Sequence, residues 1–369
     1  FCLINLHHKV FQIYYLEYKN DKMTKKPTIL LIYTGGTIGM IKDYKTNALK
    51  AFDFSQISEK IPELQQLDCT IKSISFKKPI DSSNMTTQYY AAIVDIIEEH
   101  YITVDGFVIL TGSDTMSYTS SAVSFMLENL QKPIVFTGSQ LPIGDLRTDA
   151  KENLITSVEI ACAQKNGAPI ISEVCLYFEY QLFRANRTTK ISAEQFEAFA
   201  SMNFPPLAES GVHLKFNESL IQRKKMEEAS LIVRKKLVDD VVILKLFPGI
   251  TNEVVARILN IPNLKGVVLE TYGAGNTPNS EGFIKELKIA IQKGVKIVNI
   301  SQCKSGRVLM GRYDTSILLK EIGVIDGKDM TTESAVAKLM YLLNENLSVE
   351  NFKNIFEKSL RGEMTDSTF

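Results

Sequence analysis

The sequence contains no tryptophan, only four histidines and no excess of charge of either sign. Among its 369 residues, 42 are basic and 42 are acidic, so the formal net charge is zero. A protein dedicated to nucleic acid needs a surplus of Lys and Arg to neutralise phosphates, and a similar surplus attracts proteins to anionic membranes. The balance therefore predicts no nucleic-acid partner and no membrane partner. Disorder is excluded as the dominant state, because hydrophobic residues make up 45% of the chain.

Metal-binding and disulfide frameworks are also missing. The histidines show neither an HExxH nor a zinc-finger spacing, so no metal and no other cofactor is predicted. The five cysteines are odd in number and form no CxxC motif, which indicates free thiols rather than a disulfide scaffold. No apolar run reaches the roughly 18 residues of a transmembrane helix. These absences favour a cytoplasmic protein.

Short apolar runs alternate with amphipathic segments along most of the chain. Residues 28–33, 106–110 and 134–137 are continuous apolar runs, typical of buried strands. Residues 90–97 and 123–130 carry apolar side chains every three or four positions, which predicts helices. Strands that alternate with helices in this way indicate an α/β fold with mostly parallel sheets.

A charged stretch interrupts this rhythm and divides the chain. We expect a larger N-terminal α/β domain over residues 24–211, a linker over 212–238 and a smaller C-terminal α/β domain over 239–369. The basic run at 223–225 is expected to be a solvated part of the linker, because the chain as a whole is neutral. Residues 1–23, which precede or include the first methionine, are expected to be a non-native or disordered extension.

Polar loops follow several of the predicted strands, and ligands of open α/β sheets bind at the carboxyl ends of parallel strands. The loop 33–40 is glycine-rich but contains neither GxxxxGK[ST] nor GxGxxG, which excludes a nucleotide-binding loop. The loops 81–85, 110–116, 139–149 and 182–190 add hydroxyls, carboxylates and a lysine. A hydroxyl nucleophile activated by Lys and Asp needs no other groups. On the residues alone, ordinary glycine turns and helix caps remain the alternative.

Five short motifs occur in a fixed order along the chain, namely TGGTIG (34–39), GSDTM (112–116), FTGSQLP (136–142), NRTTK (186–190) and YGAGN (272–276). Together they resemble the bacterial-type L-asparaginase family, most closely its cytoplasmic type I branch, and the likeness spans about residues 28–364. The resemblance implies two α/β domains and a homodimer or a dimer of dimers. It also implies hydrolysis of L-asparagine to L-aspartate and ammonia without a cofactor.

The resemblance assigns catalytic roles to four residues. Thr37 matches the family's nucleophile, and Ser113, Asp114 and Lys190 match its second hydroxyl, aspartate and lysine. A threonine hydroxyl is a weak nucleophile near neutral pH and must lose its proton as it attacks. Ser113 departs from the family, which normally has Thr there, and it lacks the methyl group that restricts χ1. We therefore expect retained activity with a slower rate or an altered substrate tolerance.

Substrate-binding roles follow from the same resemblance. Ser82 matches the family's substrate-holding serine and Ser83 lies beside it, so both hydroxyls suit a substrate α-carboxylate. Asp114 suits the α-ammonium group, and Gly112 is implied to line the same site. Asn276 matches a residue that the neighbouring subunit supplies.

A second, regulatory asparagine site occurs in some type I members. Thr189 and Cys303 match residues near that site, and Glu270 stands where some bacterial members have Arg, so regulation is a further expectation. The alternative for Cys303 is a buried, small apolar residue. In the family, a flexible lid that often contains a tyrosine follows TGGTIG. Residues 45–50 align with this lid, and Tyr44 lies nearby but does not align with that tyrosine.

Other functions stay open at this point. L-Glutamine differs from L-asparagine by one methylene, which a binding pocket discriminates only modestly, so a glutaminase or a mixed asparaginase-glutaminase is one alternative. A catalytically weak asparagine sensor is another, although a sensor has no need of Thr37, Asp114 and Lys190 together. An amidotransferase subunit that feeds ammonia to a tRNA-bound substrate would need an added RNA-binding domain.

Overall fold

The computed structural model describes residues 26–42, 49–51, 61–222, 230–312 and 314–366 of the chain. The predicted extension over residues 1–23, Tyr44 with most of the predicted lid, and the basic run at 223–225 lie outside the described residues. None of the helices in the described part of the chain is long and apolar enough to cross a membrane.

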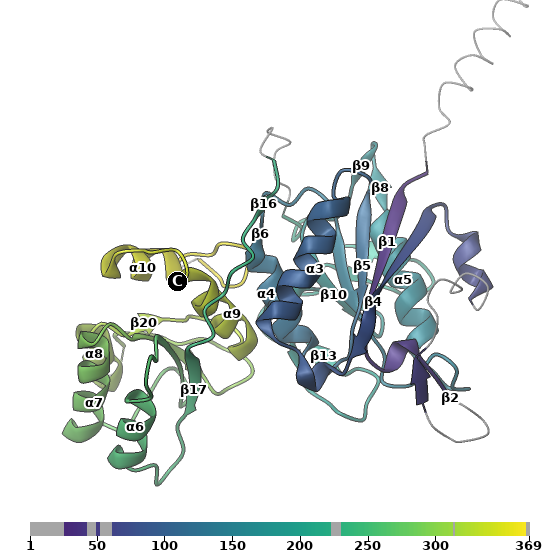
Figure 1. Cartoon of the computed structure of the whole chain (residues 1–369). Coiled ribbons are helices and arrows are strands. Elements are labelled where there is room, and N and C mark those ends of the chain that lie inside the picture. Colours follow the sequence, from purple (N-terminus) through teal and green to yellow (C-terminus); the bar gives the residue numbers. More distant parts are fainter. Residues whose placement is uncertain (1–25, 43–48, 52–60, 223–229, 313, 367–369) are drawn as a thin grey trace, which may run out of the picture.

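The larger domain is built around one eight-stranded sheet (Figure 1). Its parallel strands are, in order across the sheet, β4 (Thr70–Ile80), β1 (Thr28–Gly35), β5 (Gly106–Leu110), β7 (Ile134–Thr137) and β10 (Val174–Phe178). The sheet continues antiparallel with β11 (Gln181–Arg184), β14 (Ala208–Glu209) and β15 (Lys215–Phe216). Every residue of β1 and β5 is buried, as their apolar runs predict.

Helices cover both faces of this sheet (Figure 1). Helices α3 (Thr87–His100) and α4 (Met116–Met126) pack on one face of the sheet, and α5 (Ala150–Cys162) packs on the other. The predicted stripe over residues 90–97 is confirmed, since Ile93, Val94 and Ile97 are fully buried on α3.

Short elements connect these layers. The two-residue to three-residue strands pair as β2 (Met40–Lys42) with β3 (Leu49–Ala51), β8 (Gln164–Lys165) with β9 (Ala168–Pro169), β12 (Thr189–Lys190) with β13 (Phe199–Ala200), and β6 (Leu127–Glu128) with β16 (Ile232–Val233). Single turns of 3-10 helix occur at η1 (Thr37–Gly39), η3 (Pro62–Gln66), η4 (Ser82–Asn84) and η5 (Ala185–Arg187).

The smaller domain has a four-stranded parallel sheet in the order β17 (Val241–Lys245), β18 (Gly266–Thr271), β19 (Lys296–Ser301) and β20 (Ile325–Asp326). One face packs on α6 (Asn252–Leu259), α7 (Glu281–Gln292) and α8 (Asp314–Glu321). The other face packs on α9 (Thr332–Leu342) and, through it, on α10 (Val349–Phe356). Two α/β domains with mostly parallel sheets, as the sequence predicts, are thus confirmed.

The helix expected over residues 123–130 ends earlier than its apolar stripe. Its last helical residue is Met126, and Leu127 is already extended with φ −112° and ψ 114°. Leu127 starts β6, which pairs with β16, and Asn129 turns the chain with φ 60°. Leu127 and Leu130 are buried without being helical, because tertiary packing rather than helical period places them in the core.

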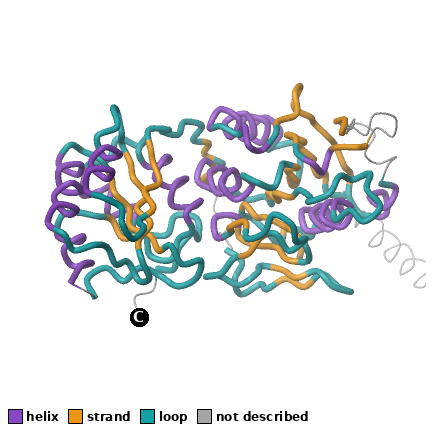
Figure 2. Tube along the Cα trace, turned by 90° about the horizontal axis from the view of Figure 1, so that it is seen from below, coloured by secondary structure: helices purple, strands orange, loops and turns teal. Residues whose placement is uncertain are grey.

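Helices α4 and α9 lie side by side where the two domains meet (Figure 1), and side chains of both belong to one hydrophobic core. Figure 2 shows the two domains side by side from below. Ala122 and Phe125 on α4 pack in the same cluster as Val268 on β18 and Leu339 on α9. The rings of Phe125 and Tyr341 are stacked with centroids 6.1 Å apart. Within the predicted linker, β15 and β16 both pair with strands of the larger domain.

A fully buried ion pair holds the C-terminal segment against α9. Lys338 and Glu363 are both 0% exposed and form a very short contact between the ammonium and the carboxylate. Glu363 also accepts backbone N–H groups from Leu360 and Arg361. Removing one partner of such a pair leaves an uncompensated charge in the protein interior.

Replacing Lys338 with Met tests this pair. We expect the free energy of unfolding to fall by about 3–5 kcal/mol, because the Glu363 carboxylate stays buried without its cation. Equilibrium unfolding in urea measures the loss. The matched control is Glu253→Gln, which breaks an exposed pair with Arg257 of 2.7 Å and should cost at most about 0.5 kcal/mol. Equal losses in the two variants would contradict the prediction.

Candidate active site

The loops that follow β1, β4 and β5 meet at one edge of the larger sheet. Gly36 has a φ of 87°, and a Cβ atom added to it would lie 2.3 Å from the backbone nitrogen of Gly112. A Cβ added to Gly112 would lie 2.5 Å from Ser82 Oγ. Such separations leave no room for a side chain, so glycine is required at both positions. The turn before Thr37 and the loop before Ser113 are therefore in direct backbone contact.

Three of the predicted catalytic residues form one cluster. Lys190 Nζ donates to Ser113 Oγ at 2.8 Å and to Asp114 Oδ1 at 2.7 Å. The Lys190 side chain is 18% exposed, whereas that of Asp114 is 67% exposed and so open to a ligand. Among the described residues, no hydrogen bond joins the Thr37 hydroxyl to this cluster; Thr37 follows Gly36, whose close approach to Gly112 brings the two loops together.

Gln140 is a site residue that the sequence does not single out, although it lies within the FTGSQLP motif. Ser113 Oγ donates to Gln140 Oε1 at 3.4 Å, and Gln140 Nε2 donates to the backbone oxygen of Gln195 at 3.0 Å. The backbone nitrogens of Gln140 and Leu141 donate to Asp149 at 2.8 and 3.0 Å. The signal that points to Gln140 is its place at the carboxyl end of β7, where ligands of such sheets bind.

Helix α4 holds the loop that carries Lys190. Thr188 Oγ1 donates to Ser117 Oγ at 3.1 Å, and Asn186 Nδ2 donates to Ser124 Oγ at 3.2 Å. Ser117 and Ser124 lie about two helical turns apart and share one face of α4. All four of these residues are buried, so each bond is shielded from water.

The same loop is bound to the smaller domain. Arg187 Nη1 lies 2.9 Å from Asp329 Oδ2 in a buried ion pair, and Thr189 Oγ1 donates to Glu333 Oε1 at 2.6 Å. Charge-assisted hydrogen bonds of this kind are stronger than neutral ones. The position of Lys190 therefore depends on contacts with both domains.

Ser82 and Ser83 lie in different surroundings. Ser82 is buried against Gly112, and its backbone oxygen accepts a hydrogen bond of 2.9 Å from Thr115. Ser83 is exposed, and its backbone nitrogen and Oγ donate to Asp81 Oδ1 at 2.9 and 2.8 Å. These bonds hold the pKa of Asp81 below its ordinary value. Of the two hydroxyls, only that of Ser83 lies at the surface.

A carboxyl group that titrates near neutral pH lies at the carboxyl end of β10. Burial, together with the nearby carboxylates of Asp149, Glu152 and Glu197, raises the pKa of Glu179 to about 7. Asp149 also accepts the backbone N–H of Gln140, so these carboxylates lie beside the loop that contacts Ser113.

Asn276 lies on the smaller domain, in the turn after β18. Tyr272 and Asn276 form an isolated antiparallel bridge, and Gly273 and Gly275 adopt φ values of 48° and 106°. Positive φ at both glycines makes this tight turn possible without strain. The turn lies at the carboxyl end of the smaller sheet.

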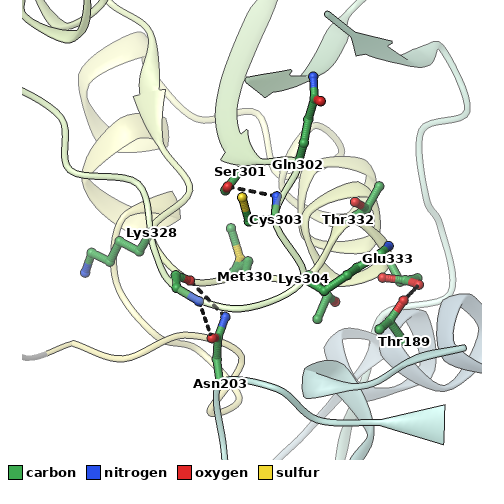
Figure 3. A pocket seen from close by; sticks show the side chains of 12 residues that line it. Thr189, Asn203, Ser301, Gln302, Cys303, Lys304, Lys328, Met330, Thr332 and Glu333 are labelled. Atoms are coloured by element: carbon green, nitrogen blue, oxygen red, sulfur yellow. Dashed lines mark hydrogen bonds between the residues drawn. The ribbon is translucent and has the colours of Figure 1, made fainter. Parts of the chain in front are cut away.

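The residues predicted for a regulatory site lie around a pocket between the domains (Figure 3). Thr189 and Asn203 line it from the larger domain, and Cys303 and Glu333 line it from the smaller one. Glu270 does not line the pocket. Its Oε1 accepts a hydrogen bond of 2.5 Å from Thr332, which does line it. The alternative of a buried Cys303 is wrong, because this thiol is exposed.

Charged groups of both signs reach this pocket. Lys304 and Lys328 line it together with Glu333. Burial raises the pKa of Glu333, and the hydrogen bond from Thr189 acts against that shift. Burial, followed by the charges of Glu333 and Glu270, raises the pKa of Tyr118 on α4 to about 12. The pocket thus has the charge pattern that suits a small zwitterion.

The described residues hold no group of three or more His, Cys, Asp or Glu side chains that is arranged to bind a metal ion. The residues that meet at the site supply hydroxyls, a carboxylate, an amine and backbone N–H groups.

Comparison with known proteins identifies this arrangement. The chain matches the family model for the N-terminal domain of asparaginase over residues 28–222 and that for the glutaminase/asparaginase C-terminal domain over residues 240–356. The chain belongs to the asparaginase family. The family expected from the five motifs is thereby confirmed.

Individual relatives of the asparaginase family agree with this result. The chain is 40% identical to L-asparaginase 1 of Escherichia coli, over 92% of this chain and 99% of that protein. It is 39% identical to the 60 kDa lysophospholipase of Mus musculus, over 91% of this chain and 62% of that protein. The crystal structure of L-asparaginase I from Vibrio cholerae matches with a TM-score of 0.83 at 38% identity, over 92% of this chain and 99% of that one.

Replacing Gly36 with Ala tests the contact between the two loops. The new Cβ would meet the Gly112 backbone, so we expect a loss of about 1–3 kcal/mol in unfolding free energy beyond the cost of positive φ. The control is Gly249→Ala, which has a similar φ of 96° but nothing within 4 Å of the new Cβ. It should show the backbone cost alone, about 1–2 kcal/mol. Urea unfolding of both variants measures the difference, and no difference would refute the close contact.

Proposed function

We propose that this chain hydrolyses the side-chain amide of L-asparagine to L-aspartate and ammonia. The observation that carries the proposal is the contact of Lys190 with Ser113 and Asp114, beside the glycine turn that leads into Thr37. The relatives from E. coli and V. cholerae, which the chain matches over nearly their whole length, are named L-asparaginases.

In the proposed reaction, Thr37 Oγ1 attacks the carbonyl carbon of the substrate amide and loses its proton as the bond forms. Backbone N–H groups of the glycine turns suit the oxyanion that develops, because no side chain blocks access to them. The substrate nitrogen takes up a proton and leaves as ammonia. Water then cleaves the ester on Thr37, which releases L-aspartate and restores the hydroxyl.

Lys190 contributes positive charge to this sequence of steps. Its ammonium group donates to Ser113 Oγ, and Ser113 Oγ donates onward to Gln140. We infer that this chain of hydrogen bonds orients the Ser113 hydroxyl and stabilises negative charge on the oxygen of the attacking water. Asp114, whose side chain is 67% exposed, suits the substrate α-ammonium group.

Binding of the α-carboxylate falls to the loop after β4. In the proposal, the exposed Ser83 hydroxyl turns from Asp81 Oδ1, to which it donates at 2.8 Å, to the substrate carboxylate, while the buried Ser82 fixes the loop against Gly112. Because Gly112 has no side chain, its backbone leaves room for the substrate chain. These roles for Ser82, Ser83 and Gly112 belong to the proposal.

We further infer a homodimer or a dimer of dimers in which Asn276 completes the site of a neighbouring subunit. In support, β17 is an edge strand, and exposed apolar side chains lie on it and on the segment that follows, at Ile243, Phe247 and Val254. An edge strand leaves backbone groups unpaired on one side, where another chain can add. The cysteines of the described residues are all free, which supports the proposed cytoplasmic location.

Ammonia release from L-asparagine tests the activity and the nucleophile. We expect the wild type to release ammonia from L-asparagine faster than from L-glutamine or D-asparagine. Thr37→Ala should lower the rate by at least about 1,000-fold, because the acceptor of the acyl group is gone. Thr34→Ala is the matched control, since Thr34 lies in the same turn but donates to the backbone of Leu110 at 3.1 Å. It should keep the rate within about tenfold and lower stability by about 1 kcal/mol.

Each other outcome points to a different function. Faster release from L-glutamine would indicate a glutaminase, and no release from any substrate would leave an asparagine sensor. Equal rates for Thr37→Ala and wild type would remove Thr37 from its assigned role.

A second proposed function is regulation by L-asparagine in the pocket between the domains. Thr189 lines this pocket and is adjacent in sequence to Lys190, so a ligand there would act on the catalytic loop directly. Lys304, Lys328 and Glu333 supply charges that match a zwitterionic amino acid.

The dependence of rate on L-asparagine concentration tests this regulation. We expect a sigmoidal curve for the wild type and a hyperbolic curve for Thr189→Val, which loses the hydroxyl that bonds Glu333. Thr103→Val, an exposed substitution after α3, is the control and should keep the sigmoidal curve. A hyperbolic wild-type curve would count against the regulatory site.

A further inference from the structure

Two cysteines meet at the edge of the larger sheet that lies opposite the candidate active site. Cys69 immediately precedes β4, and Cys162 is the last residue of α5. Both are half-buried and pack against the same core cluster. Their thiols are in contact with each other, and Cys162 Sγ donates to the backbone oxygen of Glu159 at 3.3 Å. The proposed reaction at Thr37 makes no use of either thiol.

The fold explains why residues so far apart in sequence meet here. Gly106 at the start of β5 pairs with Ile29 of β1, and Ile29 pairs with Ile71 of β4. The last turn of α5 lies on this end of the sheet, since a Cβ on Gly106 would lie 2.9 Å from the backbone oxygen of Ala161. The residues that follow Ala161 and those that precede Ile71 therefore lie at the same end of the sheet.

The surroundings make the two thiols unequal. The contact with the Cys162 thiol lowers the pKa of Cys69. Burial and the Asp68 carboxylate oppose this shift, and the Lys26 ammonium supports it. Lys26 is held near Cys69 by its ion pair with Asp68 at 3.0 Å. The same thiol–thiol contact, followed by burial, raises the pKa of Cys162. Cys69 is thus the better nucleophile, and Cys162 is the thiol that retains its proton.

We propose that Cys69 and Cys162 form a redox-active dithiol that a hydroperoxide oxidises to an intramolecular disulfide. The Cys69 thiolate attacks one peroxide oxygen, the O–O bond breaks, and the peroxide is reduced to water or an alcohol as Cys69 becomes a sulfenic acid. The Cys162 sulfur then attacks the Cys69 sulfur. An S–S bond forms, the S–O bond breaks, and the hydroxyl leaves as water with the proton of Cys162.

Little movement separates the reduced pair from the disulfide. The Cys69 and Cys162 thiols are already in contact, so rotation of the two side chains brings the sulfurs toward the S–S distance of about 2.05 Å. In a reducing compartment the pair rests as free thiols, as the structure has it, and a disulfide there is a transient response to oxidant. The bond would join β4 to α5 across the sheet edge.

Oxidation of the full-length wild-type protein with stoichiometric hydrogen peroxide tests the proposal. After alkylation of the remaining thiols, we expect a non-reducing digest to contain the Cys69–Cys162 cross-linked peptide. Cys303 serves as the internal control for exposure alone, and Cys175 serves as the control for full burial. Both should remain alkylated at a peroxide dose that consumes most of the pair.

Single variants separate the two roles. In Cys162→Ser, a dimedone-type trap should label Cys69 as the sulfenic acid, because no thiol is left to resolve it. In Cys69→Ser, labelling of Cys162 should fall at least tenfold below that level. Absence of the cross-linked peptide in the wild type, or consumption of Cys303 before the pair, would overturn the proposal.

Discussion

Helix α4 is buried on nearly every side, and the geometry of the candidate site depends on that burial. Of its eleven residues only Tyr118 is not buried, and none carries a charge. Serine and alanine side chains let the helix lie close to the sheet of its own domain, to α9 of the smaller domain and to the loop before Lys190. A larger residue at any of these contacts would separate the layers.

The burial of α4 also explains why one loop serves both domains. The segment from Asn186 to Lys190 bonds to α4 through two serines, to Asp329 and Glu333 across the domain boundary, and to Ser113 at the site. A polar segment of this kind is stable in the interior only when each group finds a partner. This one segment joins the cluster of Lys190, Ser113 and Asp114 to the pocket between the domains, which Thr189 lines.

Much of the fold and part of the site could be predicted from the sequence. The apolar runs at 28–33 and 106–110 became buried strands because a parallel sheet covered on both faces needs continuous apolar residues. The helix predicted over residues 123–130 was wrong at its end, because Leu127 leaves the helix and pairs with β16. Apolar periodicity along the chain carries no information about that pairing. Gln140 went unassigned because its side chain bonds to Ser113, 27 positions earlier, and to Gln195, 55 positions later, and no local pattern reports such contacts.

The sequence by itself determined the class of fold, the order of the motifs and the chemical groups available, because apolar periodicity and residue type act locally. Only the tertiary structure decided which of these groups touch. Lys190 meets Ser113 from 77 positions away, and Thr189 meets Glu333 from 144 positions away. Cys69 and Cys162 became a pair in the same way. Contacts of this range are set by how strands and helices pack, and packing depends on the whole chain at once.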